Sequence, residues 1–577
     1  MKKEIPGYSI SNLATCLPQA YREAFQDPGS PFIFYYAQPG EDGAYSQRIT
    51  RGEFLDMSLK AAGVIARTGL KPGDRFLNGF GSNNPLDLAF RMGAAITRTT
   101  PVTLNWQADT GERAACKASL SGARLMLVDS LLPSGIIESV TACCPEIALY
   151  NTGNLDAEPL AEKTSGEERS DDKTEKIIIF TSGTTGEPKG VVLTWENYAV
   201  NTATFRQMFS PLREDPMHLL MVNPLHHANS TAMSDWFMRE PDAVIHMLPR
   251  YATSYWTILC EVAENFSGMI IAPGVSRHFD FLEELSARDV LPESKTRLNA
   301  ALSRVSFLLG SAPVGPITVG RARHWTCRIP LVRFGSTETC LQVLGTPTHL
   351  NEQTILKAFQ AGWDRMPSPG YYIGRPHSPH TEVMVVRSAI PGDDGYMEPC
   401  APDEEGYIIA RGGNLMLGYL DEPQATREVL RDGWYLGFGD ICFFLVNPHD
   451  GEADFYWLGR ESALVIRGGA NYSCEQIANE LTKFVQRRYC IEEGMFDLAV
   501  VGLRLESEHE DTCCVMIDDS RLGAAVQEEI KATFIKEASG AVSKGSSPQR
   551  LCFGSIPRNF KGGVNIRELR KTWMEQE

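Results

Sequence analysis

The chain has 577 residues, which is enough for roughly two to four domains or subdomains, and 43% apolar with 22% charged residues is typical of a globular protein. The formal net charge of −17 argues against nucleic acid as the main partner. Fourteen cysteines without a C-x-x-C or Cys/His spacing argue against a structural metal site and favour a reducing compartment. With no signal peptide and no apolar run of membrane-spanning length, we expect a cytoplasmic protein without a membrane partner.

The first part of the chain alternates between helical and strand patterns. From about Arg51, apolar residues recur at helical spacing until Gly69 and the turn that follows it. Residues 86–105 and 121–130 continue the alternation with another helix and short apolar strands. This order predicts an α/β fold with a parallel, doubly wound sheet.

Residues 151–176 are polar and charged, and we expect an exposed connection there. The apolar run 177–180 follows, and then the segment 181–190, TSGTTGEPKG, leads into a second short apolar run. Glycines bring backbone N–H groups close to phosphate oxygens, hydroxyls add donors, and Lys189 adds a compact positive charge. The segment is not a Walker A sequence, and by composition alone a surface turn is an equally good interpretation.

The chain changes character near residue 459. The last 120 residues or so contain a strand pattern at 496–503 and a helical pattern at 524–538. That length suffices for a small core of its own. We therefore predict an N-terminal domain at 1–458 and a C-terminal domain at 459–577.

The string IIFTSGTTGEPKGVVLT at 178–194 resembles the phosphate-binding signature of the adenylate-forming superfamily, which includes acyl-CoA synthetases, luciferases and peptide-synthetase adenylation domains. Six further segments resemble the family's motifs in the family's order, so that the similarity runs from about residue 20 to 572. They are 309–314, 333–340, 404–420, 432–444, 459–473 and 556–569. The resemblance implies a large N-terminal domain of doubly wound parallel sheets with a β-rich subdomain, and a small, mobile α+β C-terminal domain.

The resemblance also implies a nucleotide site. The phosphate-binding residues would be Thr181, Ser182, Gly183, Thr184, Thr185, Gly186 and Lys189. The adenine side would be formed by Gly310, Ser311, Ala312, Pro313, Phe334, Gly335 and Ser336. Thr337 would bind the α-phosphate, Glu338 with Thr185 would hold Mg²⁺, and Asp440 and Arg460 would contact the ribose or a phosphate. Taken singly, Thr337 and Asp440 also suit a turn or a helix cap, and Arg460 suits a surface ion pair.

Two positions depart from the family pattern. Gly563 stands where the terminal loop usually carries a lysine that supports adenylate formation. Lys561 lies two residues earlier, and we expect either that it replaces the missing lysine or that it is an ordinary solvated side chain. Ala463 stands near the usual hinge residue, which weakens the transfer of that role but does not forbid rotation.

The segment 223–240 falls where the family binds the acid and admits the thiol. His227 matches the family's histidine, and His226 replaces an aromatic residue. The polar residues in this stretch indicate a small or polar carboxylate, since burying them without partners costs free energy. Asp235 and Arg239, spaced i and i+4, are more simply a helical ion pair, and an amino-acid substrate is possible but not preferred.

The leading prediction is an acyl-CoA synthetase that uses ATP and Mg²⁺ to join a carboxylic acid to CoA. One alternative transfers the acyl group to the thiol of a carrier protein. Another is a nucleotide-binding homologue in which Gly563 has weakened adenylation.

Overall fold

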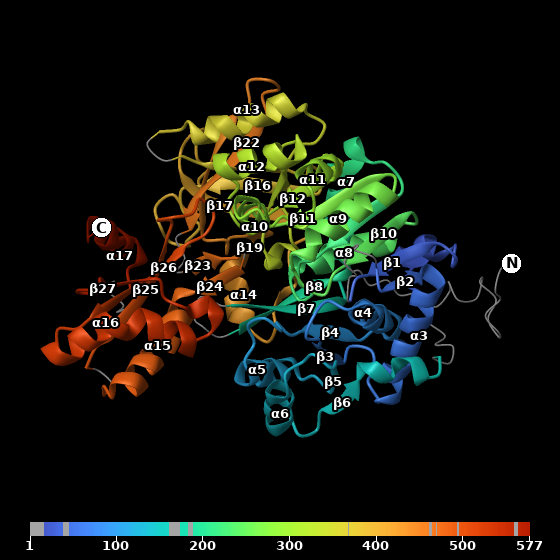
Figure 1. Cartoon of the computed structure of the whole chain (residues 1–577), viewed down its shortest axis with the longest axis horizontal. Helices are drawn as coiled ribbons and strands as arrows, with labels where there is room; N and C mark the ends of the chain where they lie inside the picture. Colours follow the sequence, from blue (N-terminus) through green and yellow to red (C-terminus); the bar gives the residue numbers. More distant parts are fainter. Residues whose placement is uncertain are drawn as a thin grey trace.

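The computed structural model describes residues 17–37, 45–160, 173–182, 188–366, 369–460, 464–468, 470–492, 495–558 and 564–576 (Figure 1). In these ranges no helix combines the length and the apolar character that a bilayer crossing requires. The predicted α/β class is confirmed: helices pack on both faces of two large sheets, and the last part of the chain has small sheets of its own.

The first sheet has seven strands in the order β18-β8-β7-β4-β3-β5-β6. Its strands are β3 (Arg75–Gly79), β4 (Thr100–Thr103), β5 (Leu125–Val128), β6 (Ala148–Asn151), β7 (Glu175–Ser182), β8 (Pro188–Thr194) and β18 (Gly418–Tyr419). The associated helices are α3 (Arg51–Arg67), α4 (Pro85–Thr97), α5 (Gly111–Ser121), α6 (Ser134–Cys143) and the 3₁₀ turn η3 (Thr152–Ala157). The predicted helix from Arg51 is confirmed, and Thr50 and Glu53 form a capping box at its start.

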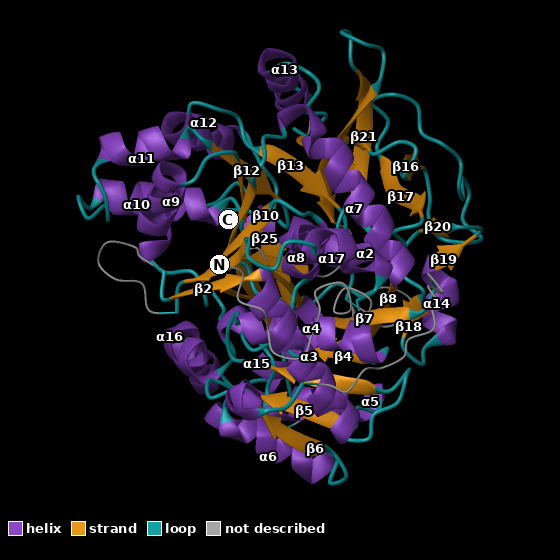
Figure 2. Ribbon diagram, turned by 90° about the vertical axis from the view of Figure 1, so that its right-hand side faces the viewer, coloured by secondary structure: helices purple, strands orange, loops and turns teal. Residues whose placement is uncertain are grey.

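The second sheet has a parallel part formed by six neighbouring strands, with one antiparallel strand at its edge. These are β1 (Pro31–Tyr35), β2 (Gln47–Thr50), β9 (Met217–Met221), β10 (Ala243–Met247), β11 (Met269–Gly274), β12 (Val305–Leu309) and β13 (Leu331–Phe334). One face is covered by α9 (Ser254–Asn265), α10 (Arg277–Ala287), α11 (Lys295–Leu302) and α12 (Pro316–Thr326) (Figure 2). The other face is covered by α7 (Trp195–Phe209) and α8 (Ala228–Arg239), with the short α2 (Gln19–Arg22), η2 (Glu23–Phe25) and η4 (Ser210–Leu212) nearby.

The same sheet continues as an antiparallel, β-rich extension beyond β13. Its strands are β14 (Leu344–Gly345), β15 (Tyr371–Pro376), β16 (Thr381–Val386), β17 (Gly406–Gly412), β19 (Leu430–Arg431), β20 (Trp434–Tyr435), β21 (Asp440–Val446) and β22 (Ala453–Arg460). The helices of this region are η5 (Thr337–Thr339), α13 (Glu352–Trp363) and α14 (Pro423–Val429).

Residues after 464 build two small sheets with their own apolar cores, on the left in Figure 1. The strands are β23 (Leu464–Arg467), β24 (Ala470–Ser473), β25 (Asp497–Leu503), β26 (Thr512–Asp518) and β27 (Arg550–Phe553). The helices are α15 (Cys474–Tyr489), α16 (Ala524–Ala541), η6 (Lys544–Ser546) and α17 (Ile566–Gln576). The predicted strand at 496–503 and helix at 524–538 are present as β25 and α16, and the domain boundary at 459 stays a prediction.

Candidate active site

The hydroxyl-rich segment is the tip of an antiparallel hairpin. β7 and β8 pair so that Thr181 lies opposite Lys189 and Ser182 lies opposite Pro188. Lys189 is half-buried, and its Nζ lies 5.2 Å from the centroid of the Tyr419 ring. Gly183, Thr184, Thr185 and Gly186 lie outside the described residues, so their predicted roles stay predictions.

Glu338 reaches the same tyrosine from a different element. It sits in η5, directly after β13, and its Oε1 accepts a hydrogen bond of 3.1 Å from the Tyr419 hydroxyl. Burial, and then the nearby Glu338 carboxylate, raises the pKa of Tyr419, so the phenol keeps its proton and remains a donor. Tyr419 thus contacts both charged residues: Lys189 lies near its ring, and Glu338 accepts from its hydroxyl. Neither the spacing nor the residue type of Tyr419 singled it out in the sequence.

Hydrogen bonds from the segment before β18 stabilise the turn that carries Thr337 and Glu338. The Asn414 side-chain amide donates to the carbonyls of Thr339 and Gln342, both at 2.9 Å. The Met416 N–H donates to the Glu338 carbonyl at 2.7 Å. A Cβ at Gly335 would lie 2.2 Å from the Leu341 carbonyl oxygen, so this position requires glycine. Backbone contacts therefore fix the direction of the Glu338 carboxylate.

The predicted adenine segments follow β12 and β13. Gly310 comes directly after β12, and Ser311 has a left-handed backbone with φ 68°. The Pro313 carbonyl accepts a hydrogen bond of 3.1 Å from the Ser276 hydroxyl, while Ala312 is half-buried. Phe334 closes β13, and Gly335 and Ser336 follow it into η5. Both segments therefore lie at the carboxyl ends of neighbouring parallel strands, where open α/β sheets bind ligands.

The predicted ribose carboxylate is buried and already oriented. Asp440 begins β21, is 2% exposed, and lies opposite Arg460 of β22 in the strand register. Its Oδ1 accepts a hydrogen bond of 2.7 Å from the Trp457 indole N–H. Sequence reasoning missed Trp457, because its contact with Asp440 depends on the pairing of β21 with β22.

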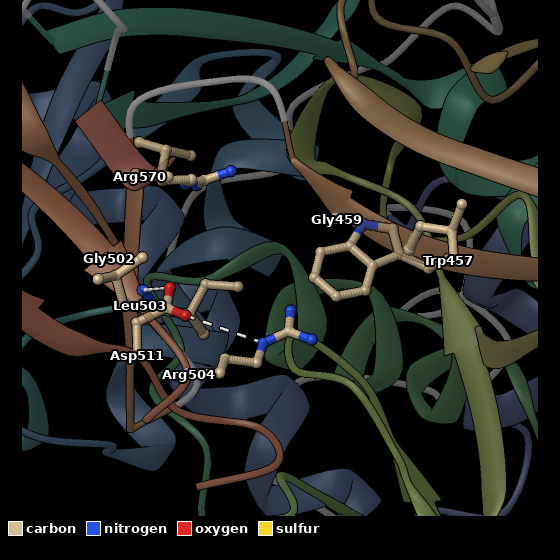
Figure 3. A pocket seen from close by; sticks show the side chains of 10 residues that line it. Trp457, Gly459, Gly502, Leu503, Arg504, Asp511 and Arg570 are labelled. Atoms are coloured by element: carbon tan, nitrogen blue, oxygen red, sulfur yellow. Dashed lines mark hydrogen bonds and ion pairs between the residues drawn. The ribbon is translucent and has the colours of Figure 1, made fainter. Parts of the chain in front are cut away.

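A cavity of about 200 Å³ lies between β22 and the sheet formed by β25 and β26 (Figure 3). On one side is Trp457, and on the other is Arg504, whose Cζ lies 4.4 Å from the Trp457 ring centroid. The Arg504 Nε is 3.8 Å from the Asp511 Oδ1, and Arg570 also lines the space. The part of the chain after 464 thus contacts the same tryptophan that binds Asp440.

The histidine pair lies at the start of α8. Burial, and then the charge of Lys117, lowers the pKa of His227 to about 4, so its imidazole is neutral at pH 7. Burial also lowers the pKa of His226, and the two rings are 4.3 Å apart. Lys117 forms a buried ion pair of 2.6 Å with Asp109. In the described part of the chain, His227 makes no hydrogen bond with Lys189, Glu338 or Asp440.

Most polar groups of α8 have partners inside the protein. Arg239 binds Asp235 at 2.8 Å, which confirms the helical ion pair, and Asp235 also binds Lys176 at 3.0 Å and the Tyr21 hydroxyl. Ser230 donates to the Asn223 carbonyl at 2.7 Å. These groups are satisfied without a ligand, so the polarity of the helix does not itself support a polar acid.

The chemistry of the site fits a hard cation only in part. In the described ranges, no three His, Cys, Asp or Glu side chains gather into a metal-binding group. Of the two residues that the sequence assigns to the metal, Glu338 is described, and it offers a half-buried carboxylate. Mg²⁺ usually takes one or two carboxylates and completes its shell with water and phosphate oxygens, so one carboxylate suits an ion that arrives with a nucleotide.

Several CoA ligases are similar in sequence to this chain over most of its length. Indoleacetate–CoA ligase from Aromatoleum aromaticum is 25% identical over 573 residues, covering 96% of this chain and 98% of the relative. 2-Succinylbenzoate–CoA ligase from Geobacillus kaustophilus is 26% identical, covering 90% and 92%, and a long-chain-fatty-acid–CoA ligase from Mycobacterium tuberculosis is 24% identical, covering 94% and 96%.

Solved structures share the fold. The o-succinylbenzoate CoA synthetase from Bacillus subtilis with its product analogue has a TM-score of 0.72 at 18% identity, covering 97% of this chain and 98% of that one. ATP-bound MatB from Rhodopseudomonas palustris has a TM-score of 0.61 at 20% identity, covering 98% and 99%. A model of the AMP-binding enzyme family matches residues 22–420. The chain therefore belongs to the AMP-binding enzyme family, as its motifs predict.

Proposed function

We propose that this protein activates a carboxylic acid with ATP, releasing pyrophosphate, and then transfers the acyl group from the acyl-adenylate to the thiol of CoA. Activation of an acid and transfer to CoA are the activities that the family match and the CoA ligase relatives support. The observation that carries the proposal is the meeting of Lys189 and Glu338 at Tyr419, because a cation and a carboxylate close together suit a phosphate and its metal.

The candidate site residues that the structure describes each have a task in this proposal. Lys189 and the Thr337 hydroxyl bind phosphate oxygens, and Asp440 accepts hydrogen bonds from the ribose. Glu338 would hold Mg²⁺, which supplies charge neutralisation at the phosphates when it is bound. Catalysis then consists mainly of positioning the acid carboxylate in line with the α-phosphorus, while neutral His227 lies at the acid end.

The second step needs access for CoA. We infer that the domain after residue 459 rotates about a hinge near residues 459–463, between an adenylating and a thiol-accepting orientation. Ala463 lies outside the described residues.

Lys561 also lies outside the described residues. If Lys561 replaces the lysine that the family has at the position of Gly563, Lys561→Ala should lower acid-dependent pyrophosphate release roughly tenfold or more. Unchanged release would contradict that role.

A cytoplasmic location also stays a proposal, supported by the absence of disulfides among the described cysteines.

The proposal is tested with a library of carboxylic acids assayed for pyrophosphate release, with and without CoA. We expect acid-dependent release and, when CoA is present, a CoA thioester. Release without thioester would favour a carrier-protein thiol as the acceptor. ATP binding without any acid-dependent release would instead identify a nucleotide-binding homologue and contradict the proposed activity.

A further inference from the structure

Arg333 is a buried cation for which the described part of the chain supplies no ion-pair partner. It is 6% exposed, and its Nε and Nη2 atoms are buried without a hydrogen-bond acceptor in the described part of the chain. Burial lowers the pKa of its guanidinium to about 10, so the group is still charged at pH 7. An isolated buried cation is costly, which means that the fold tolerates Arg333 at the expense of stability.

Among the described residues, three other arginines that are at most 8% exposed have oxygen partners. Arg239 and Arg375 pair with Asp235 and Asp454 at 2.8 and 2.6 Å. Arg51 donates to two backbone carbonyls, the nearer at 2.6 Å. Arg333 is the exception, so an acceptor supplied by a ligand would account for it.

The neighbours of Arg333 leave room for its side chain. Gly310 follows the last paired residues of β12 and lies beside Arg333, and a Cβ at Gly310 would lie only 2.9 Å from the Arg333 Cζ. Phe334 and Gly335 come next in the chain. The guanidinium therefore lies beside Gly310, at the carboxyl ends of β12 and β13, where open α/β sheets bind ligands.

The side chain belongs to the face of the sheet that carries α8. Leu331 packs in the same core as Phe205 of α7 and Met233 of α8, and residues two apart on a strand share a face. At the start of α8, both ring nitrogens of His226 and the Oδ1 of Asn229 are also buried without partners in the described residues. Because the resemblance assigns residues 223–240 to the acid, these three atoms are further candidates for hydrogen bonds with a polar group of it.

We propose that Arg333 binds a second anionic group of the acid, distant from the carboxylate that is activated, so that the substrate is a dicarboxylic acid or an acid with an equivalent second anion. The inference rests on the proposed adenylation of an acid. Nε–H and Nη2–H form one edge of the guanidinium, and two parallel N–H groups match the two oxygens of a carboxylate. Arg333 is thus a specificity-determining residue.

The reactive carboxylate is a poorer partner for Arg333. Its charge disappears when the acyl-adenylate forms, which would leave the guanidinium unpaired again. A strong bond to the nucleophilic oxygens would also stabilise the ground state and slow their attack. A second anion keeps its charge through both steps, and so it compensates Arg333 throughout.

The test compares acids of equal carbon number with one or two carboxylates, using the wild-type protein, Arg333→Met and Arg333→Lys. We expect the wild type to prefer the diacid, and Arg333→Met to lower kcat/KM for the diacid about a hundredfold without changing KM for ATP. The monoacid should react equally well or better with the variant. Arg333→Lys should recover only part of the diacid activity, because an ammonium cannot bind both oxygens in one plane.

Thermal unfolding without ligands separates binding from a structural role. Arg333→Met should raise Tm because it removes an unpaired buried charge, whereas the control Arg375→Met should lower Tm because it leaves the buried Asp454 carboxylate without its cation. A lower Tm with equal loss of activity on both acids would overturn the proposal. A raised KM for ATP would assign the guanidinium to a phosphate instead, and a wild type that prefers monoacids would also contradict it.

Calorimetric titration with the diacid alone distinguishes this proposal from the proposed function. If the diacid binds the wild type and not Arg333→Met, yet no acid supports pyrophosphate release, the anion site stands and the adenylation fails. If acids are activated but diacid binding is unaffected in Arg333→Met, adenylation stands and the role of Arg333 is wrong.

Discussion

At the scale of single residues, Tyr419 connects the two charged groups of the phosphate site. Tyr419→Phe keeps the ring beside Lys189 but removes the hydrogen bond to Glu338. We expect kcat for pyrophosphate release to fall about tenfold, since a hydrogen bond to a charged group is worth more than a neutral one. Tyr150→Phe is a matched control, because the Tyr150 hydroxyl donates to Glu158 at 3.2 Å outside the site. Equal losses in both variants would contradict the role of Tyr419.

Trp457 holds the predicted ribose carboxylate in place. Trp457→Phe removes the N–H that binds Asp440 and keeps an aromatic ring beneath Arg504. KM for ATP should rise about fivefold to tenfold, and the preference for ATP over 2′,3′-dideoxy-ATP should shrink. Trp325→Phe, which removes a similar bond of 2.8 Å to Glu283, should leave both values unchanged. If Trp457→Phe weakens both nucleotides equally, Trp457 does not act through ribose recognition.

The sequence motifs predict the charged residues of the candidate site but not the residues that orient them. Lys189, Glu338 and Asp440 belong to short contiguous motifs, and such motifs can be found without a structure. Tyr419 and Trp457 act across 81 and 17 residues of chain, so their contacts depend on the pairing of β18 with β8 and of β21 with β22. Their residue types alone carried no signal of that pairing.

At the scale of elements, a helix with a strong local sequence pattern was predicted, whereas very short strands were not. The helix from Arg51 combines apolar periodicity with a capping box, and it is present as α3. The antiparallel strands β14 and β18–β20 have two residues each, which is too short for a periodic pattern. The polarity of α8 was open to two interpretations, and the internal partners of Asp235 and Arg239 decided for the structural one.

The loop between β25 and β26 attaches the C-terminal part to the start of α12. The Glu508 carboxylate accepts from the N–H groups of Ile317 and Thr318, both at 3.2 Å, which is favourable at a helix N-terminus. His509 adds a contact of 2.8 Å to Asp280. A rotation of the C-terminal part must break this contact and also the contact of Arg504 with Trp457.

Glu508→Ala should therefore release the C-terminal part from α12. Amide hydrogen exchange at Ile317 and Thr318 should accelerate at least about threefold, because these two N–H groups lose their acceptor. Glu506→Ala is the control in the same loop, since Glu506 binds Arg550 within the C-terminal part. Unchanged exchange in Glu508→Ala would show that the contact does not hold the two parts together.

At the scale of the whole molecule, buried histidines predict how stability depends on pH. Burial lowers the pKa to about 4 in His218, His227, His278 and His377. It also lowers the pKa of His226 and His246 well below the usual range. Because the unfolded chain takes up protons at about pH 6.5, their contribution to stability is complete above that pH and is lost as the pH falls towards 4.

The free energy of unfolding should accordingly fall by about 1.4 kcal/mol per pH unit for each histidine below pH 6. Urea unfolding at a series of pH values measures the slope and hence the number of protons taken up. His278→Gln should reduce that number by about one. A stability that stays constant between pH 6.5 and 4.5 would contradict the assignment of neutral buried imidazoles.

The proposed catalyst requires ATP to lie at one particular place in the whole molecule. A crystal structure of the protein with ATP or a stable acyl-adenylate analogue tests this directly. We predict ribose hydroxyls within hydrogen-bond distance of Asp440 and the α-phosphate beside Lys189, Thr337 and Glu338, between β8 and β21. Adenosine bound elsewhere, with these side chains free of contact to it, would contradict the proposed catalyst.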